Sequence, residues 1–129
     1  MRQEELNELS AGILKAAYRV HTAFGPGLLE SAYTASLVYE LRRSGFDVKT
    51  EVPVPVVYDG VKLADVGFRI DILVNDVVVI EVKSLEKIAP VHLSQLISYL
   101  KLSNRRLGLL LNFNVESLTR GIYRRVNQF

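Results

Sequence analysis

Two neighbouring apolar segments constrain the fold of this chain more than any other feature. Residues 68–74 and 77–83 are rich in Ile and Val and flank Asn75-Asp76, a pattern that predicts a β-hairpin buried at the centre of a sheet. Three charged residues interrupt the two segments, namely Asp71, Glu81 and Lys83. Because burying an unpaired charge in such a strand costs several kcal/mol, we expect a partner for these charges beside them.

A divalent cation is one such partner. The carboxylates of Asp71 and Glu81, together with the main-chain carbonyl of Val82, offer the oxygen ligands that Mg²⁺ or Mn²⁺ prefers. Since side chains alternate along a strand, Lys83 projects from the same face as Glu81, where its ammonium group can orient a water molecule or stabilise charge on a phosphate. The alternative is a buried ion pair between Lys83 and one of the acids, without a metal.

The register of the hairpin tests the metal hypothesis, because residues that face each other in a hairpin share a sheet face. If Asn75-Asp76 alone formed the loop, Asp71 would pair with Ile80 and lie on the opposite face from Glu81. The metal hypothesis therefore requires a three-residue connection, or a β-bulge near the site, so that Asp71 faces Glu81.

Two amphipathic helices are predicted before the hairpin. Apolar residues recur at helical spacing in residues 6–24, and Gly25-Pro26-Gly27 ends that pattern. A second apolar stripe covers residues 28–41 and closes at Ser44-Gly45, a C-terminal signal for a helix. We therefore expect two helices joined by a tight turn.

Strands follow these helices. The β-branched residues 52–58 predict a strand that ends at Asp59-Gly60, a strong signal for a two-residue hairpin. Pro53 and Pro55 lie on one side of this strand and lack a backbone donor, which predicts a strand at the edge of the sheet or one paired along one side only.

The last third of the chain predicts a crossover onto the same sheet. Apolar spacing after Pro90 indicates a helix that ends near Ser103-Asn104, and residues 107–113 form an almost wholly apolar strand. Residues 120–126 alternate weakly and fit either a short strand or a helix. The fold class is therefore α/β, or α+β with a mixed sheet.

Length and composition exclude several classes of protein. The 129 residues are typical of one domain, predicted to span residues 1–129, and the absence of Cys excludes disulfides, thiolate zinc sites and cysteine nucleophiles. The sequence lacks both the roughly 20-residue apolar run of a membrane span and the pattern of a signal peptide, so we expect a cytoplasmic protein with no membrane partner. The net charge of +2 permits an anionic partner without requiring one, and the arginine clusters are typical of solvated helix ends and edge strands.

Polar residues on the predicted helices are further candidates. Gln95 and Tyr99 lie four residues apart and share a helix face from which an amide and a hydroxyl can reach the sheet, although polar residues beside an apolar stripe are commonplace. Glu30 is a favourable first-turn acid near the positive end of a helix dipole and gains catalytic value only beside the sheet carboxylates. His92, one turn before Gln95, either joins this polar edge or lies on the surface, and we expect the surface position.

The order of these polar residues along the predicted elements resembles that of the PD-(D/E)XK nuclease superfamily. The residues that carry the resemblance are Glu30, Asp71, Glu81-Val82-Lys83, Gln95 and Tyr99. The likeness is closer to its GxxExxY branch, because residues 27–33 read Gly-Leu-Leu-Glu-Ser-Ala-Tyr, and residues 67–71 and 110–113 look like further blocks of that branch. The resemblance implies a restriction-endonuclease-like core, with two N-terminal helices, a central mixed sheet containing an antiparallel meander, a crossover helix and a further strand.

The resemblance also implies a metal-dependent nuclease that hydrolyses phosphodiester bonds in DNA or RNA. In that mechanism Asp71, Glu81 and the Val82 carbonyl bind one or two Mg²⁺ ions, for which Mn²⁺ can substitute, Glu30 helps position the metal or its water, and Lys83 lies beside the nucleophilic water. Three residues would contact substrate or support the site, namely Arg69, Gln95 and Tyr99.

Two other functions stay open on the sequence alone. The chain fits a catalytically inactive nuclease-fold module that binds nucleic acid or a partner protein, and it fits a structural protein whose buried charges form a salt-bridge network. A nuclease domain of this size needs additional grip on its substrate, so we expect a homodimer or a partner protein, through the first helix or the proline-containing edge strand.

Overall fold

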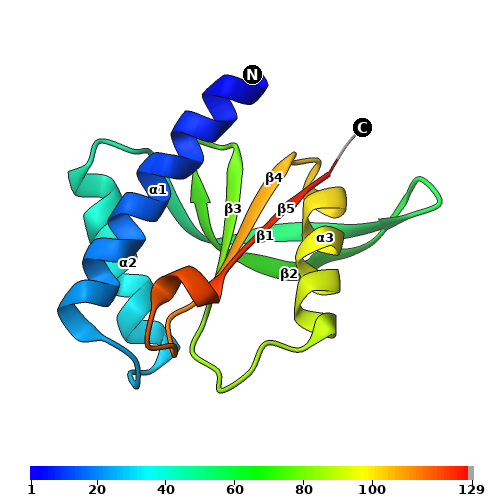
Figure 1. Ribbon diagram of the computed structural model, residues 1–129. Helices are drawn as coiled ribbons and strands as arrows, with labels where there is room; N and C mark the ends of the chain where they lie inside the picture. Colours follow the sequence, from blue (N-terminus) through cyan, green and yellow to red (C-terminus); the bar gives the residue numbers. More distant parts are fainter. Residues whose placement is uncertain (128–129) are drawn as a thin grey trace.

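The computed structural model describes residues 1–127 as a mixed five-stranded sheet with helices on both faces (Figure 1). Residues 128 and 129 of the predicted domain lie outside the described part. The helices are α1 (Gln3–Phe24), α2 (Glu30–Arg43) and α3 (Pro90–Ser103), with a short 3₁₀ helix η1 (Leu118–Gly121). The strands are β1 (Val48–Tyr58), β2 (Val61–Val74), β3 (Val78–Lys83), β4 (Leu107–Asn112) and β5 (Ile122–Val126). The predicted α+β architecture with a crossover helix is confirmed.

Strand order in the sheet follows chain order, from β1 to β5. The first three strands form an antiparallel meander, and α3 then carries the chain across so that β4 pairs parallel to β3. The tail, for which the sequence left strand and helix open, contains η1 and then β5, which pairs antiparallel with β4. As predicted from its prolines, β1 lies at an edge of the sheet.

Two apolar layers hold the helices against the sheet. Alternate residues of β3, namely Val78, Ile80 and Val82, pack with α1 and α2 in one cluster. Val79 faces the other way and packs against Leu96 and Leu100 of α3. Because β3 is covered on both faces, its sequence is almost continuously apolar, and a charged residue within it is unusual.

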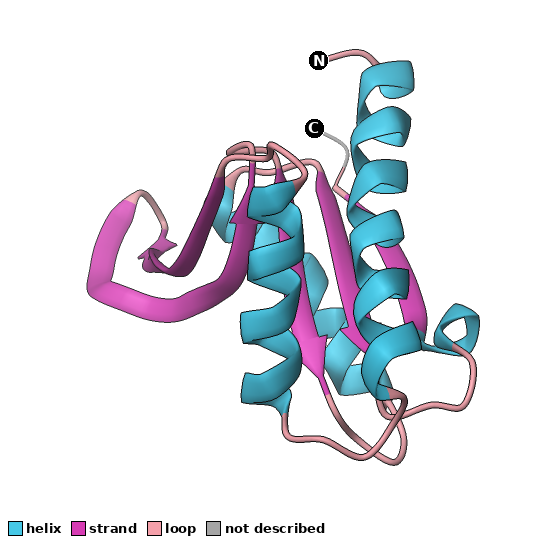
Figure 2. Cartoon of the chain, turned by 90° about the vertical axis from the view of Figure 1, so that its left-hand side faces the viewer, coloured by secondary structure: helices cyan, strands magenta, loops and turns pink. Residues whose placement is uncertain are grey.

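The β1–β2 hairpin bends away from the rest of the sheet (Figure 2). Its turn is the predicted two-residue loop, in which Tyr58 pairs with Val61 and both Asp59 and Gly60 have positive φ, as a type I′ turn requires. Register shifts around Val56 mark an irregularity in the ladder, and Gly67 lies against it, where a Cβ would come within 2.0 Å of the Val56 side chain.

Within residues 1–127, no helix is both long and apolar enough to span a membrane.

Candidate active site

The connection between β2 and β3 contains three residues, 75–77. Val74 pairs with Val78, and the ladder continues to the pair formed by Ile72 and Ile80. The next position in this register places Asp71 opposite Glu81. The structure therefore meets the three-residue condition that the metal hypothesis set.

Asp71 lies where β2 separates from β3, one residue beyond the last paired position. Its Oδ2 accepts a hydrogen bond of 3.0 Å from the backbone N–H of Val82. This bond crosses between the two strands and fixes the carboxylate beside the Glu81-Val82-Lys83 tripeptide.

Glu81 is buried within β3, with an exposed fraction of only 6%, and its Oε1 has no hydrogen-bond partner. Burial raises the pKa of Glu81 to about 9, and the neighbouring negative charge of Asp71 adds to this effect, whereas Lys83 opposes it. A buried carboxyl oxygen without a partner is the atom that a cation would satisfy, so the donor set fits a divalent metal held by Asp71, Glu81 and the Val82 carbonyl.

Lys83 is half-buried at the C-terminal end of β3, two residues from Glu81. It pairs with the buried Asn112 on β4, whose side chain exchanges two hydrogen bonds of 3.0 Å with the backbone of Leu85. Asn112 thereby fixes the chain immediately after the tripeptide. The sequence pattern does not indicate this contact, because Asn112 and the Leu85 backbone lie 27 residues apart.

Glu30 is exposed and is the first residue of α2. It lines an open groove of about 590 Å³ between α2 and the β1–β2 ladder, together with Asp71, Thr34 and Arg42. The structure thus brings Glu30 to the same groove as Asp71, whose carboxylate is bound to the backbone N–H next to Glu81. Within residues 1–127, no three His, Asp or Glu side chains are grouped closely enough to hold a metal ion together.

Glu51 is a further acid in this groove that sequence reasoning missed. It lies on β1 between two paired positions, Thr50 opposite Ile72 and Val52 opposite Ile70, so it faces Asp71 across the ladder. Its φ of 51° is in the left-handed region, which is rare for a non-glycine residue within a strand. Only the alternation of inward and outward side chains along residues 48–54 could have indicated the position of Glu51, and the left-handed backbone at Glu51 interrupts that alternation.

Gln95 and Tyr99 lie on α3, as expected from their spacing, but they differ in surroundings. The ring of Tyr99 stacks on Phe68 of β2, with centroids 3.7 Å apart. Burial raises the pKa of the Tyr99 hydroxyl, and the negative charges of Glu81 and Asp71 raise it further. Tyr99 therefore lies near the paired carboxylates. Gln95 is exposed one turn earlier, and Arg69 is exposed on β2, without an ion pair to Asp71 or Glu81 among the described residues.

His92 is half-buried, not on the open surface as expected. Its Nδ1 accepts a 2.9 Å hydrogen bond from the backbone N–H of Ala89, one of the donors that the start of α3 leaves without a helical partner. A histidine in this position stabilises the helix start, so it has a structural contact that its sequence position did not reveal.

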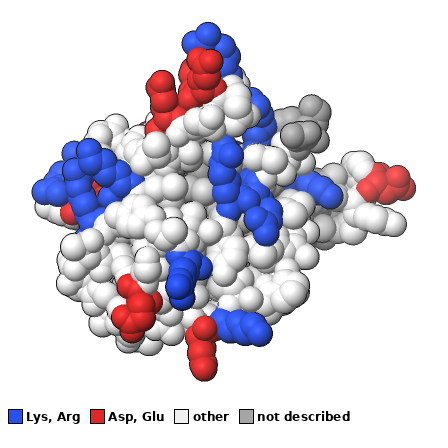
Figure 3. Space-filling view, viewed as in Figure 1, with Lys and Arg blue, Asp and Glu red and all other residues white. Residues whose placement is uncertain are grey.

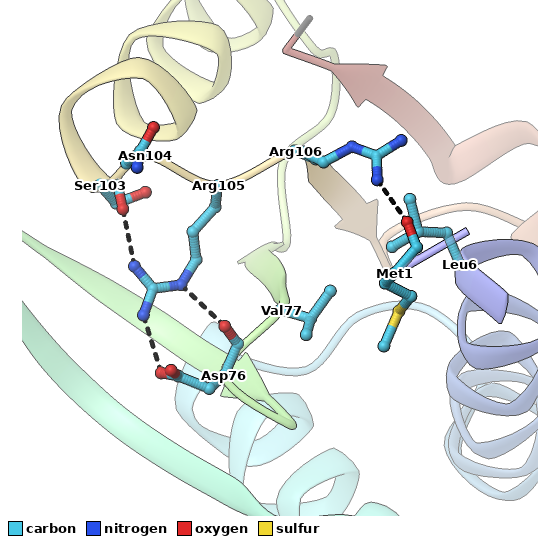
Figure 4. Close-up of a pocket in the computed structure, with 8 residues that line it drawn as sticks. All are labelled: Met1, Leu6, Asp76, Val77, Ser103, Asn104, Arg105 and Arg106. Carbon is cyan, nitrogen blue, oxygen red and sulfur yellow. Dashed lines mark hydrogen bonds and ion pairs between the residues drawn. The ribbon is translucent and has the colours of Figure 1, made fainter. Parts of the chain in front are cut away.

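A second hollow, of about 630 Å³, lies at the opposite end of β3, beside the 75–77 turn (Figure 4). Arg105 fills one wall and is engaged within the protein, with hydrogen bonds to Ser103 and Asp76 and an ion pair of 2.7 Å to Asp76. Arg106 donates to the Met1 carbonyl. These contacts are structural and lie far along β3 from the paired acids.

The charged residues form no single basic band on the face shown in Figure 3, where Lys and Arg are interspersed with Asp and Glu on a mostly uncharged surface. Two of the arginine clusters from the sequence make local contacts, since Arg43 pairs with Glu40 and Arg124 donates to Asn7. The geometry at Asp71 and Glu81, not the overall charge, carries the functional argument.

Comparison with known proteins places the chain in a family. Neither the curated proteins nor the solved structures include a match. The family model described as PD-(D/E)XK nuclease superfamily matches residues 7–126, which include the groove, the paired acids and the crossover helix. A match over nearly the whole chain, on a mixed sheet that aligns an acid of β2 with the Glu-Val-Lys tripeptide of β3, shows that this protein belongs to the PD-(D/E)XK nuclease superfamily.

Proposed function

We propose that the protein is a divalent-metal-dependent nuclease of the GxxExxY branch that hydrolyses phosphodiester bonds in DNA or RNA. The observation that carries this proposal is the position of the Asp71 carboxylate, hydrogen-bonded to the backbone N–H of Val82, beside the buried Glu81, whose Oε1 has no hydrogen-bond partner. Salt-bridge networks satisfy their acids with cations of the protein, whereas this oxygen lacks one. The arrangement therefore supports a metal site better than a purely structural network.

Members of the superfamily generally use divalent metals, and Mg²⁺, with Mn²⁺ as a substitute, suits the oxygen ligands of this site. Asp71, Glu81 and the carbonyl of Val82 would hold the ion. When bound, such an ion lowers the pKa of water and neutralises charge on the scissile phosphate.

The remaining residues have proposed roles that follow from their positions. Lys83, on the same strand as Glu81, orients the attacking water and stabilises charge on the phosphate. Glu30 acts from the α2 side of the groove and helps position the metal or its water. Gln95, Tyr99 and Arg69 contact substrate or support the carboxylates from α3 and β2.

Cleavage of labelled DNA and RNA tests the proposal. Wild-type protein should cleave at least one of these polymers with Mg²⁺ or Mn²⁺ and none with EDTA, and Glu81→Ala and Lys83→Ala should each lower the rate by about 100-fold or more. Equal rates in wild type and both variants would show that cleavage comes from a contaminating nuclease.

Calorimetry tests the metal site separately. Titration of Mn²⁺ should give binding heat for wild type and none for Asp71→Ala, since removal of one ligand leaves too few oxygens for the ion. Equal heats for both proteins would place the ion elsewhere.

The second candidate is an inactive module that binds nucleic acid or a partner protein. The bent hairpin favours it, because several large apolar side chains of β1 and β2 are exposed there, namely Val57, Tyr58, Val61, Leu63 and Val66. Metal binding without cleavage of any DNA or RNA would support this second candidate over the first.

A further inference from the structure

The loop between α1 and α2 is held from two sides at one residue, Leu28. The hydroxyl of Tyr33 accepts a 3.1 Å hydrogen bond from the Leu28 N–H and donates one of 2.6 Å to the Gly25 carbonyl. The hydroxyl of Ser84 donates to the Leu28 carbonyl at 2.6 Å. We call Tyr33, Leu28 and Ser84 the Leu28 clamp.

The clamp joins α2 to the end of β3. Ser84 follows Lys83 directly, so its bond to Leu28 ties the loop to the strand that carries Glu81. The ring of Tyr33 stacks on Phe113 with centroids 4.7 Å apart, and the Phe113 N–H donates to the Lys83 carbonyl. Two independent contacts therefore connect the loop before Glu30 with the strand end at Lys83.

The geometry of the loop also determines where α2 begins. Gly27 has a φ of 104°, a conformation that favours glycine, and only two residues separate it from Glu30. Leu29 caps the helix, and the Ala32 N–H donates to its carbonyl at 3.1 Å. Because the clamp fixes Leu28, it fixes the first turn of α2, where Glu30 enters the groove beside Asp71.

Tyr33 itself cannot reach a substrate, since it is fully buried and its hydroxyl is used by two backbone groups. We propose that the Leu28 clamp is a positioning device, in which Tyr33 and Ser84 set Glu30 relative to the strand that carries Glu81 and Lys83. This inference rests on the proposed nuclease function. It gives linked roles to three residues of segment 27–33: Gly27 forms the turn, Glu30 is the acid in the groove, and Tyr33 positions Glu30.

The test uses Tyr33→Phe, which removes both hydrogen bonds and keeps the ring stacked on Phe113. Tyr18→Phe is the matched control, because it removes one hydroxyl hydrogen bond, to Thr119 at 2.9 Å, from an exposed site on α1. We expect Y33F to lower kcat for cleavage in Mn²⁺ by about 10- to 100-fold, with KM changed less than about twofold. Y18F should keep kcat within about twofold of wild type.

A double-mutant cycle with Glu30→Gln separates positioning from a general structural effect. If Tyr33 acts through Glu30, then Y33F in the E30Q background should change kcat by less than about twofold. Ser84→Ala should show the same dependence on Glu30, and Ser84→Thr, which keeps a hydroxyl, should restore kcat. Persistence of the full Y33F effect in the E30Q background would overturn the inference.

Amide hydrogen exchange gives a readout that does not depend on cleavage. The Leu28 amide should exchange at least about 10-fold faster in Y33F than in wild type or Y18F, because its hydrogen bond to the Tyr33 hydroxyl is lost. Unchanged exchange would overturn the clamp even in an active enzyme. If wild type cleaves no substrate while Leu28 is protected, the proposed function is wrong and the catalytic role of the clamp falls with it.

Discussion

At the scale of single residues, Glu81 combines two opposing requirements. It lies on the same face of β3 as the fully buried Val79, where packing favours an apolar side chain, yet it carries a carboxyl whose Oε1 has no hydrogen-bond partner. Burial raises the pKa of Glu81 to about 9, so without a metal the carboxyl keeps its proton at neutral pH. The free energy of unfolding must therefore depend on pH through this group.

The sign of that dependence can be tested in EDTA. Because the folded-state pKa is about 9 and the ordinary value is 4.5, the metal-free protein should be most stable below about pH 4.5 with respect to this group and should lose that contribution as the pH rises towards 9. Glu81→Gln does not ionise, so its free energy of unfolding should exceed that of wild type by an amount that grows between pH 5 and pH 9, by at most about 1.4 kcal/mol per pH unit. A difference that stays constant over this range would contradict the assigned burial effect.

Gly121 offers a prediction about backbone packing. A Cβ at this position would lie 2.0 Å from the carbonyl oxygen of Asn112, and a backbone atom cannot move aside cheaply. Gly121→Ala should lower the free energy of unfolding by about 1–3 kcal/mol, measured by urea denaturation.

Gly12→Ala provides the control for that measurement. An alanine Cβ at this position would lie 2.8 Å from Cζ of the Phe46 ring, but this half-buried side chain can shift. Alanine also favours the helix by about 1 kcal/mol over glycine, so we expect a smaller loss of stability than for Gly121→Ala. An equal loss in both variants would show that the Asn112 contact has no special cost.

Sequence reasoning identified Asp71 and Glu81 because a charge in a β-branched apolar segment is conspicuous. It did not identify Glu51, since the left-handed φ at that position depends on how β1 bends against β2, and no residue type in the segment signals that bend.

At the scale of elements, the length of the 75–77 turn determines which side chains meet. Deletion of Asp76 would leave a two-residue connection and move Asp71 opposite Ile80, on the other face from Glu81. We expect the deletion variant to lose Mn²⁺ binding in calorimetry. Asp76→Ala keeps the turn length and removes the same ion pair to Arg105, so it should retain binding. Equal affinity in the two variants would show that register does not control the site.

Element boundaries were predictable where local chemistry decides them. The type I′ signal Asp59-Gly60 and the left-handed Asn104 at the end of α3 lie where the sequence placed them. The predicted start of α2 was wrong. Leu28 and Leu29, which we expected in the apolar stripe of the helix, precede it and are exposed. Contacts with Tyr33 and Ser84, which periodicity does not contain, hold this segment in the loop.

At the scale of the whole molecule, the bent β1–β2 hairpin projects away from the rest of the fold (Figure 2). Tyr58 and Leu63 are 72% and 62% exposed. The expected homodimer remains a prediction, and this hairpin includes the proline-containing edge strand, which is one of the two elements expected to form it, the other being the first helix.

Light scattering at micromolar concentration checks this prediction. Wild type should have the mass of a dimer, and a variant with Tyr58→Ser and Leu63→Ser should have the mass of a monomer with an unchanged circular dichroism spectrum, because both side chains are exposed in the single subunit and their replacement costs its fold less than about 0.5 kcal/mol each. A monomeric wild type would exclude the homodimer and favour a different partner protein.

The burial of Glu81 also bears on how such a chain evolves. A lineage in which the activity is no longer selected gains folding free energy from a change of Glu81 to Val or Ile, because Val79, two residues away on the same face of β3, is already buried in the apolar cluster against α3. Because the inactivating change also stabilises the fold, selection for stability would retain it, and the descendants should be more heat-resistant than their active ancestors. Retention of an acid at this position is then a sign of continuing selection for chemistry, readable before any substrate has been found.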